Sequence, residues 1–231
     1  MLKVNYPKHD LGLYTVSEGA LYAGITPAKV RNWFFGYDRK IRGQKIHVEG
    51  MINPEITSEN EKLITFRDLL EARVIGLFAN SLSIQKIKKA KNILQEILDD
   101  DYPFSSGKIK TDGKNIFCVS NLDDHVLDVF SFQENMLPVI QRSLIDIDFD
   151  QAIPKQWWVK GKEKGIVINP SRSFGQPIEY KSGIPTISLY NMMKSTNDLK
   201  KASRFFDVDE DSVQRAYEFH ETLNNKNAHL H

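Results

Sequence analysis

Basic and amide side chains gather in one segment near the beginning of the sequence, shortly after a threonine that could begin a helix. Lysine and arginine neutralise phosphates, and arginine and asparagine also hydrogen-bond the edges of bases in the major groove. This combination of side chains in one segment favours contact with double-stranded DNA. The candidate DNA-binding residues are Thr26, Lys29, Arg31, Asn32, Arg39, Arg42 and Lys45.

The other reactive side chains form no recognisable catalytic or metal-binding pattern. The sequence has no phosphate-binding loop of the form G-x-x-x-x-G-K-[ST], no G-x-G-x-x-G after an expected strand and no G-x-S-x-G. Its 6 histidines are scattered, Cys118 is the single cysteine, and the acidic clusters at 99–101 and 123–124 fall in expected turns. We predict that the protein is not an enzyme and uses no metal and no cofactor.

Two short helices within residues 14–37 must position the first of these cations. Thr15 and Glu18 have the spacing of a capping box, and Gly24 can end the first helix in a left-handed conformation. Thr26 is a good N-cap for a second helix, with Pro27 at its first position. Two helices joined by so short a turn match the helix-turn-helix pattern, although an ordinary corner of two helices would give the same signature.

The second helix should have one apolar and one polar face. Val30, Trp33 and Phe34 recur at helical spacing and should face the core, which leaves the basic residues of this helix on the other side. Residues 38–56 then alternate polar and apolar side chains between glycines, as in a hairpin. A hairpin after a helix-turn-helix is the wing of a winged-helix fold. Its cations near a phosphate backbone would be Arg39, Lys40, Arg42 and Lys45.

Two further helices are expected from Phe66 to about Ala79 and from Ile84 to about Leu98. The side chains of Thr65 and Ser83 can cap them. The expected apolar stripe of the first helix consists of Leu69, Leu70, Val74 and Leu77. That of the second consists of Ile84, Ile87, Leu94 and Leu98, joined by Ile93 and Ile97. The lysines expected on or beside the solvent face of the second helix are Lys86, Lys88, Lys89 and Lys91.

Residues 14–98 resemble the N-terminal part of MerR-type winged-helix regulators. The resemblance is carried by YTVSEGALYAGITPAKVRNW, by the expected wing and by LITFRDLLEARVIGLFANSLSIQKIKKAKNIL. It implies that residues 27–33 form a recognition helix in the major groove and that the wing touches the DNA backbone. The long dimerising helix typical of that family is missing, so dimerisation would need another element.

Downstream, the pattern changes to short alternating strands and then back to helices. Residues 101–165 predict a small antiparallel β region, with a hairpin turn at Asp112-Gly113 and with Trp157 and Trp158 as core aromatics. Residues 166–231 predict a β-hairpin, a helix capped by Thr186 and a second pair of helices. We therefore expect an α+β protein with a DNA-binding domain at 1–100, a β region at 101–165 and a C-terminal domain at 166–231 for dimerisation or toxin binding.

Residues 166–224 resemble the domain-of-unknown-function family numbered 433, through IVINPSRSFGQPIEYKSGIPT and LKKASRFFDVDEDSVQRAYEF. Together with the MerR-like segment, the arrangement is similar to a VapB-type antitoxin with its own DNA-binding domain. The resemblance implies a homodimer that represses its own operon and neutralises a PIN-type nuclease toxin. The candidate partner-binding residues are Arg172 and Phe174.

Composition and charge indicate a cytoplasmic protein without a membrane partner. The chain has 231 residues, a formal net charge of +1, a single cysteine and no long apolar run. Residues 1–50 carry 8 Lys/Arg against 4 Asp/Glu, whereas residues 198–221 carry 4 against 7. A basic N-terminal segment and an acidic C-terminal segment would orient the molecule towards a polyanion.

The sequence therefore predicts a sequence-specific DNA-binding antitoxin and autorepressor. Two alternatives stay open. One is a MerR-like transcriptional regulator whose β region senses a small molecule. The other is a protein-interaction scaffold in which both helix pairs only pack.

Overall fold

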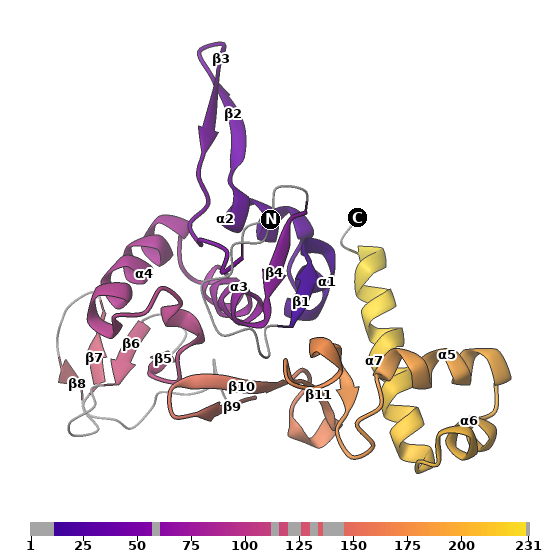
Figure 1. Cartoon of the computed structure of the whole chain (residues 1–231). Helices are drawn as coiled ribbons and strands as arrows, with labels where there is room; N and C mark the ends of the chain where they lie inside the picture. Colours follow the sequence, from indigo (N-terminus) through magenta and orange to yellow (C-terminus); the bar gives the residue numbers. More distant parts are fainter. Residues whose placement is uncertain are drawn as a thin grey trace. The chain divides into compact units, whose positions relative to one another are not determined.

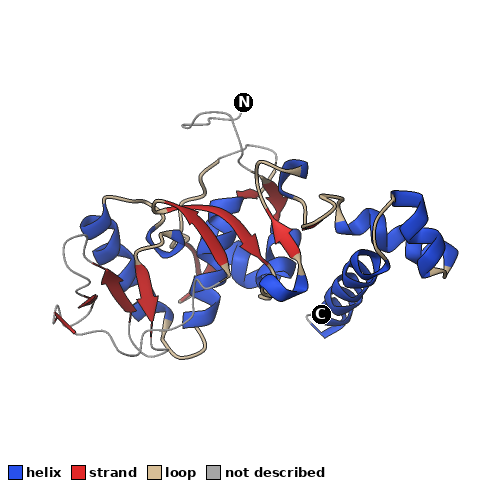
Figure 2. Cartoon of the chain, turned by 90° about the horizontal axis from the view of Figure 1, so that it is seen from below, coloured by secondary structure: helices blue, strands red, loops and turns tan. Residues whose placement is uncertain are grey.

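The computed structural model describes residues 12–56, 61–111, 116–119, 126–129, 134–135 and 146–229. Helices and small sheets make up the chain (Figures 1 and 2), so the predicted α+β class is confirmed. The chain divides into two compact units, the first built mainly from Tyr14–Ile145 and the second mainly from Lys155–His231. The predicted domain boundaries near residues 100 and 165 stay predictions.

The first unit has a helical core with predicted caps that the structure confirms. Thr15 and Glu18 form a capping box, the Thr26 hydroxyl accepts the N–H of the third helical residue, and Thr65 and Ser83 cap the two later helices. The apolar faces of these helices pack together, with Leu69, Leu70, Ile75, Ile87 and Leu94 fully buried. The elements are β1 (Leu13–Thr15), α1 (Val16–Ala23), α2 (Pro27–Phe35), β4 (Leu63–Thr65), α3 (Phe66–Phe78), α4 (Ile84–Leu98) and the 3-10 turn η1 (Pro103–Ser105).

A two-stranded hairpin, β2 (Tyr37–Ile41) and β3 (Gln44–Val48), follows α2 and extends away from these helices (Figure 1). The strands are antiparallel, with Tyr37 opposite Val48 and Ile41 opposite Gln44. Arg42 and Gly43 make the tip with φ of 49° and 84°, and positive φ at both positions suits the twist of a tight hairpin. The predicted hairpin is confirmed over residues 37–48, whereas residues 49–56 of the expected range contain no strand.

Parts of the expected helix faces are wrong. Leu77, Ile84 and Ile97 were expected in apolar stripes, but 44%, 38% and 43% of their surfaces are exposed. Lys91 was expected on or beside the solvent face, but it is 3% exposed and its Nζ donates to the Asp101 carbonyl at 3.1 Å. The inward face of α4 consists of residues 87, 90, 91 and 94, because η1 packs against α3 and α4 and covers this side of the helix.

A small antiparallel sheet in the order β5-β6-β7-β8 also belongs to the first unit. Cys118 lies buried in it and packs as a small apolar side chain. The predicted turn at Asp112-Gly113 lies outside the described residues. The strands are β5 (Ile109–Thr111), β6 (Ile116–Val119), β7 (Val126–Asp128) and β8 (Glu134–Asn135).

The second unit combines strands with three helices. A four-stranded sheet has the order β12-β11-β10-β9, and its residues Phe149–Pro154 are grouped with the first unit. The predicted core aromatics Trp157 and Trp158 are buried in β10. Thr186 does not cap α5 as expected, since its hydroxyl donates to the Pro177 carbonyl at 3.1 Å instead. The elements are β9 (Ile147–Asp150), β10 (Ile153–Trp158), the 3-10 turns η2 (Lys162–Lys164) and η3 (Ser173–Gly175), β11 (Ile166–Ile168), β12 (Ile178–Glu179), α5 (Thr186–Thr196), α6 (Leu199–Phe206) and α7 (Glu210–His229).

Candidate nucleic-acid interface

Helix α2 presents an open basic face. Val30, Trp33 and Phe34 are buried at 0%, 7% and 4% exposure, and this fixes the helix by its apolar side. Lys29 and Arg31 lie on the exposed side and have no ion-pair partner among the described residues. The side that sequence spacing assigned to solvent is therefore exposed, with its two cations uncompensated.

The N-terminus of α2 has local features that favour the binding of an anion. Thr26 accepts the backbone N–H of Lys29 through its hydroxyl at 3.3 Å, and Pro27 occupies the first helical position. The first turn contains no acidic side chain. The positive end of the helix dipole is therefore left without a carboxylate next to it. Asn32 lies on the exposed side of the same helix, one turn further along.

The hairpin carries two kinds of cation. Arg39 and Arg42 are exposed and have no ion-pair partner in the described ranges. Lys45 is also exposed, but its Nζ lies 2.8 Å from a carboxylate oxygen of Asp38. His47 contacts the other oxygen of Asp38 at 2.8 Å, and hydrogen bonds from Lys45 and His47 hold the pKa of Asp38 below its ordinary value. Lys45 is therefore partly neutralised within the hairpin, whereas the two arginines are not.

A groove of about 490 Å³ brings three elements of the first unit together. Helix α2 contributes Asn32, the hairpin contributes Tyr37 and Arg39, and the N-terminal part of α4 contributes Gln85 and Lys88. Helices α2 and α4 and the hairpin are thus arranged around one concave surface. Its cations outnumber its one acid, Glu49, by two to one.

The N-terminal part of α4, residues 84–89, was not among the predicted site residues. Lys86, Lys88 and Lys89 are all exposed there, and Lys88 lines the groove. The sequence signal that could have found it is the lysine run without a nearby acid. Sequence spacing alone does not show that the N-terminal part of α4 borders the same groove as Asn32.

Buried carboxyl groups anchor the elements behind this surface. Asp68 accepts the backbone N–H groups of Thr65 at 3.0 Å and of Glu55 at 3.3 Å, and burial raises its pKa to about 7. Glu71 is fully buried, accepts the N–H of Ser105 at 2.6 Å and has its pKa raised by burial to about 8. These bonds fix the start of α3 and hold η1 against it.

The predicted partner-binding residues lie in the second unit, on the turn that contains η3. Phe174 is 90% exposed, the largest exposed fraction among the large apolar side chains of the described residues. Ser173 and Phe174 have φ of 47° and 56°, a left-handed conformation that non-glycine residues rarely adopt. Gly183 makes room for the side chain of Arg172, because a Cβ at position 183 would lie 2.6 Å from Nη2 of Arg172. The structure therefore places the two residues on one strained turn, where Phe174 is exposed and Arg172 is half-buried.

Similarity to known proteins is limited to the fold. No protein-family model matches the chain, and no curated protein matches it. The X-ray crystal structure of Rv2018 from Mycobacterium tuberculosis is similar, with a TM-score of 0.61 and 16% sequence identity. The match covers 91% of this chain and 99% of that one. The two chains thus share a fold over nearly their whole lengths.

Two further features bear on the kind of site. Within the described ranges, no helix is both long and apolar enough to cross a bilayer. The same part of the chain contains no group of three or more His, Cys, Asp or Glu side chains that could hold a metal ion.

Proposed function

We propose that the protein is a sequence-specific DNA-binding protein whose first unit is a winged helix-turn-helix. The observation that carries this proposal is the exposed, unpaired face of α2, with Lys29 and Arg31 beside a protruding hairpin. A surface that serves only packing would gain nothing from uncompensated cations at this position. A duplex would supply their counter-charges.

In the proposed complex, α2 enters the major groove and the hairpin follows the backbone. Lys29, Arg31 and Asn32 then contact base edges or phosphates, and Arg39 and Arg42 contact phosphates. Lys45 contributes less, since Asp38 already compensates its charge at 2.8 Å. Lys88 adds a phosphate contact from α4, because it borders the same groove.

The same proposal includes an antitoxin role in the cytoplasm. A homodimer would present two copies of α2 to a palindromic operator, and the protein would repress its own operon. Arg172 and Phe174 would contact a PIN-type nuclease toxin. The support for this second part is the exposure of Phe174, since a large aromatic side chain in water is typical of a protein contact.

DNA binding is tested by fluorescence anisotropy with the duplex upstream of the protein's own gene. Arg31→Ala and Lys29→Ala should each weaken binding, by about 1–3 kcal/mol where the contact is to a base edge. Lys200→Ala is the matched control, because Lys200 is an exposed lysine of the second unit. Removal of one phosphate contact should also reduce the slope of log affinity against log salt by about 1.

A flat salt dependence for the unmodified protein would contradict the DNA proposal. So would equal affinities of Arg31→Ala, Lys29→Ala and the Lys200→Ala control. Either result would favour the protein-interaction scaffold, in which α1 and α2 only pack.

The antitoxin role has a separate test. Co-expression with the product of the adjacent gene should yield a complex with a small nuclease and suppress its activity. Phe174→Ala and Arg172→Ala should weaken that complex and leave DNA binding unchanged. Ile153→Ala is the control for loss of an exposed apolar side chain, since Ile153 is 65% exposed elsewhere. A complex that tolerates both substitutions would contradict the proposed contact.

A further inference from the structure

The groove of the first unit is lined by apolar side chains as well as by cations. Tyr37 and Ile84 line it with 43% and 38% of their surfaces exposed, and Met51 is half-buried in the same lining. Single exposed apolar residues are common on protein surfaces, but these three lie around one concavity of about 490 Å³. Such a lining suits a ligand with apolar groups as well as negative charges.

The hairpin has two different faces, and the more apolar one lines the groove. Tyr37 pairs with Val48 and Arg39 pairs with Ile46, so these four side chains share one face by the alternation of strands. Of the four, Tyr37, Arg39 and Val48 line the groove. The side chains of the opposite face are those of Asp38, Lys40, Lys45 and His47. A ligand in the groove therefore meets Arg39 and not Lys40.

The end of α2 fixes the base of the hairpin beside the groove. The Trp33 carbonyl accepts the N–H of Met51 at 2.7 Å and the N–H of Ile52 at 3.0 Å. A Cβ at Gly50 would lie 2.6 Å from the same carbonyl oxygen, so glycine permits this close approach. The lining of the groove is therefore arranged before a ligand arrives, and this lowers the entropic cost of binding.

The charge of the groove is positive but small. Arg39 and Lys88 have no ion-pair partner among the described residues, and the exposed acid Glu49 belongs to the same lining. Two cations against one acid would attract a polyanion only weakly, because exposed charges are screened by salt. Strong binding here would need the apolar side chains as well.

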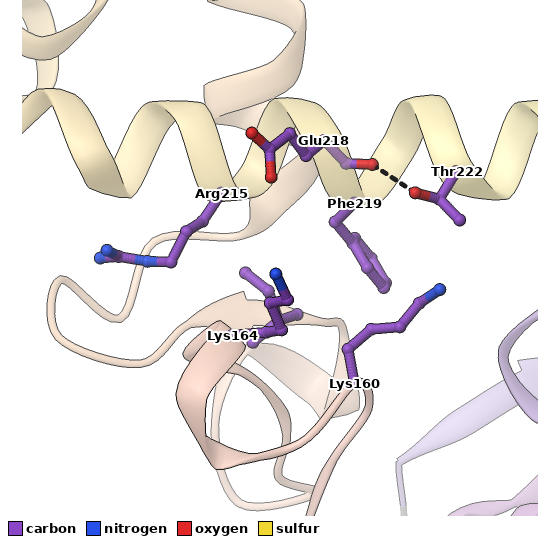
Figure 3. Close-up of a pocket in the computed structure, with 7 residues that line it drawn as sticks. Lys160, Lys164, Arg215, Glu218, Phe219 and Thr222 are labelled. Atoms are coloured by element: carbon purple, nitrogen blue, oxygen red, sulfur yellow. Dashed lines mark hydrogen bonds between the residues drawn. The ribbon is translucent and has the colours of Figure 1, made fainter.

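A smaller cavity in the second unit differs in this respect. Its volume is about 190 Å³, and α7 and the turn before β11 line it (Figure 3). Its arginine, Arg215, donates to Glu179 at 2.6 Å and lies 3.8 Å from Asp209. The charge of Arg215 is thus compensated within the chain, whereas Arg39 and Lys88 remain available to a ligand.

We propose that the groove of the first unit holds one strand of the sugar–phosphate backbone of a DNA duplex. Arg39 and Lys88 contact phosphates, and Tyr37 and Ile84 pack against the apolar edges of the deoxyribose rings between them. A DNA strand offers both kinds of group in regular succession. The inference rests on the DNA-binding function proposed above and adds to it side chains that bind without neutralising charge.

The test is fluorescence anisotropy of the full chain with the duplex upstream of its own gene, at several salt concentrations. Tyr37→Ala and Ile84→Ala should each weaken binding by about three- to tenfold through loss of apolar contact, with an unchanged salt slope. Arg39→Ala should weaken binding and also lower that slope by about 1. Tyr37→Phe should bind like the unmodified protein, because it keeps the ring.

Two control variants match these substitutions. Leu77→Ala should leave the affinity unchanged, since Leu77 is 44% exposed on α3 and does not line the groove. Lys40→Ala removes a cation from the opposite face of the hairpin, so it should change the salt slope much less than Arg39→Ala. Tyr37→Ala should weaken binding to an unrelated duplex of equal length by the same factor, because a sugar contact carries no sequence information.

The outcomes separate this inference from the proposed function. If the unmodified protein binds the duplex but Tyr37→Ala and Ile84→Ala behave like Leu77→Ala, the backbone does not lie in the groove and only this inference fails. Equal affinities of Tyr37→Phe and Tyr37→Ala, both weakened, would also overturn it. A changed oligomeric state of Tyr37→Ala in analytical ultracentrifugation, with unchanged DNA affinity, would assign the groove to a contact between copies. If the unmodified protein binds no duplex, the proposed function fails together with this inference.

Discussion

The buried carboxyl group of Glu71 should make the stability of the first unit depend on pH. The Oε1 atom accepts the N–H of Ser105 at 2.6 Å, whereas Oε2 is buried and has no hydrogen-bond partner among the described residues. Burial raises the pKa to about 8, against the opposing effects of the Ser105 N–H and the Lys91 ammonium. We therefore expect Glu71 to be protonated in the folded state at neutral pH.

The sign and size of the effect follow from proton linkage. In the unfolded chain Glu71 loses its proton near its ordinary pKa of 4.5, whereas in the folded chain it keeps the proton until about pH 8. Between these values the folded state binds more protons, so the free energy of unfolding falls as pH rises, by about 1.4 kcal/mol per pH unit at most. The stabilisation is complete below pH 4.5 and is lost through pH 8. The upper limit is about 4–5 kcal/mol.

Glu71→Gln keeps the shape of the side chain and removes the titration. Hydrogen exchange of the α3 amides, corrected for intrinsic rates, gives the free energy of opening at several pH values from 5 to 8. We expect that free energy to fall with pH in the unmodified protein and to fall much less in Glu71→Gln. Asp68, whose pKa burial raises to about 7, should leave a smaller slope of the same sign.

The matched control is Glu96→Gln, since Glu96 is an exposed glutamate on α4. It should retain the full slope of the unmodified protein. Equal slopes for Glu71→Gln and Glu96→Gln would refute the reasoning, because Glu71 would then titrate alike in the folded and unfolded chains.

Three other predictions concern the α2 segment, the hairpin and the second unit. Gly36→Ala should displace the hairpin and weaken DNA binding in the anisotropy assay. The φ of Gly36 is 69°, and a Cβ there would lie 2.2 Å from the Val48 carbonyl oxygen. Gly43→Ala is the control, because a Cβ at the open tip of the hairpin would meet no atom within 4 Å. Thr26→Ala should lower stability by about 1 kcal/mol through loss of the N-cap, measured by urea denaturation, and Thr26→Ser should restore it. Burial lowers the pKa of His220 to about 4, so the folded state keeps the imidazole neutral below its ordinary pKa of 6.5. The free energy of unfolding should therefore fall as the pH falls from 6.5 towards 4. Thermal denaturation of His220→Gln should show a smaller loss of stability over that range.

Local signals in the sequence determined where the helices of the first unit begin and where the hairpin lies. The side-chain oxygens of Thr15, Thr26 and Ser83 each accept the free backbone N–H three residues later. This hydrogen bond is local, so it forms without help from the rest of the fold. The spacing of Val30, Trp33 and Phe34 likewise assigned the faces of α2, since a short helix with three large apolar residues has one way to bury them.

Only the tertiary structure decided which groups meet across long stretches of chain. Glu71 meets Ser105, and Arg215 of α7 meets Glu179 of β12, pairings that no local pattern encodes. The same reason explains the errors in α4, where Lys91 is buried because η1 covers that side of the helix. Helical spacing groups residues into faces, but the neighbour that packs against a face determines whether it becomes core, groove or binding surface.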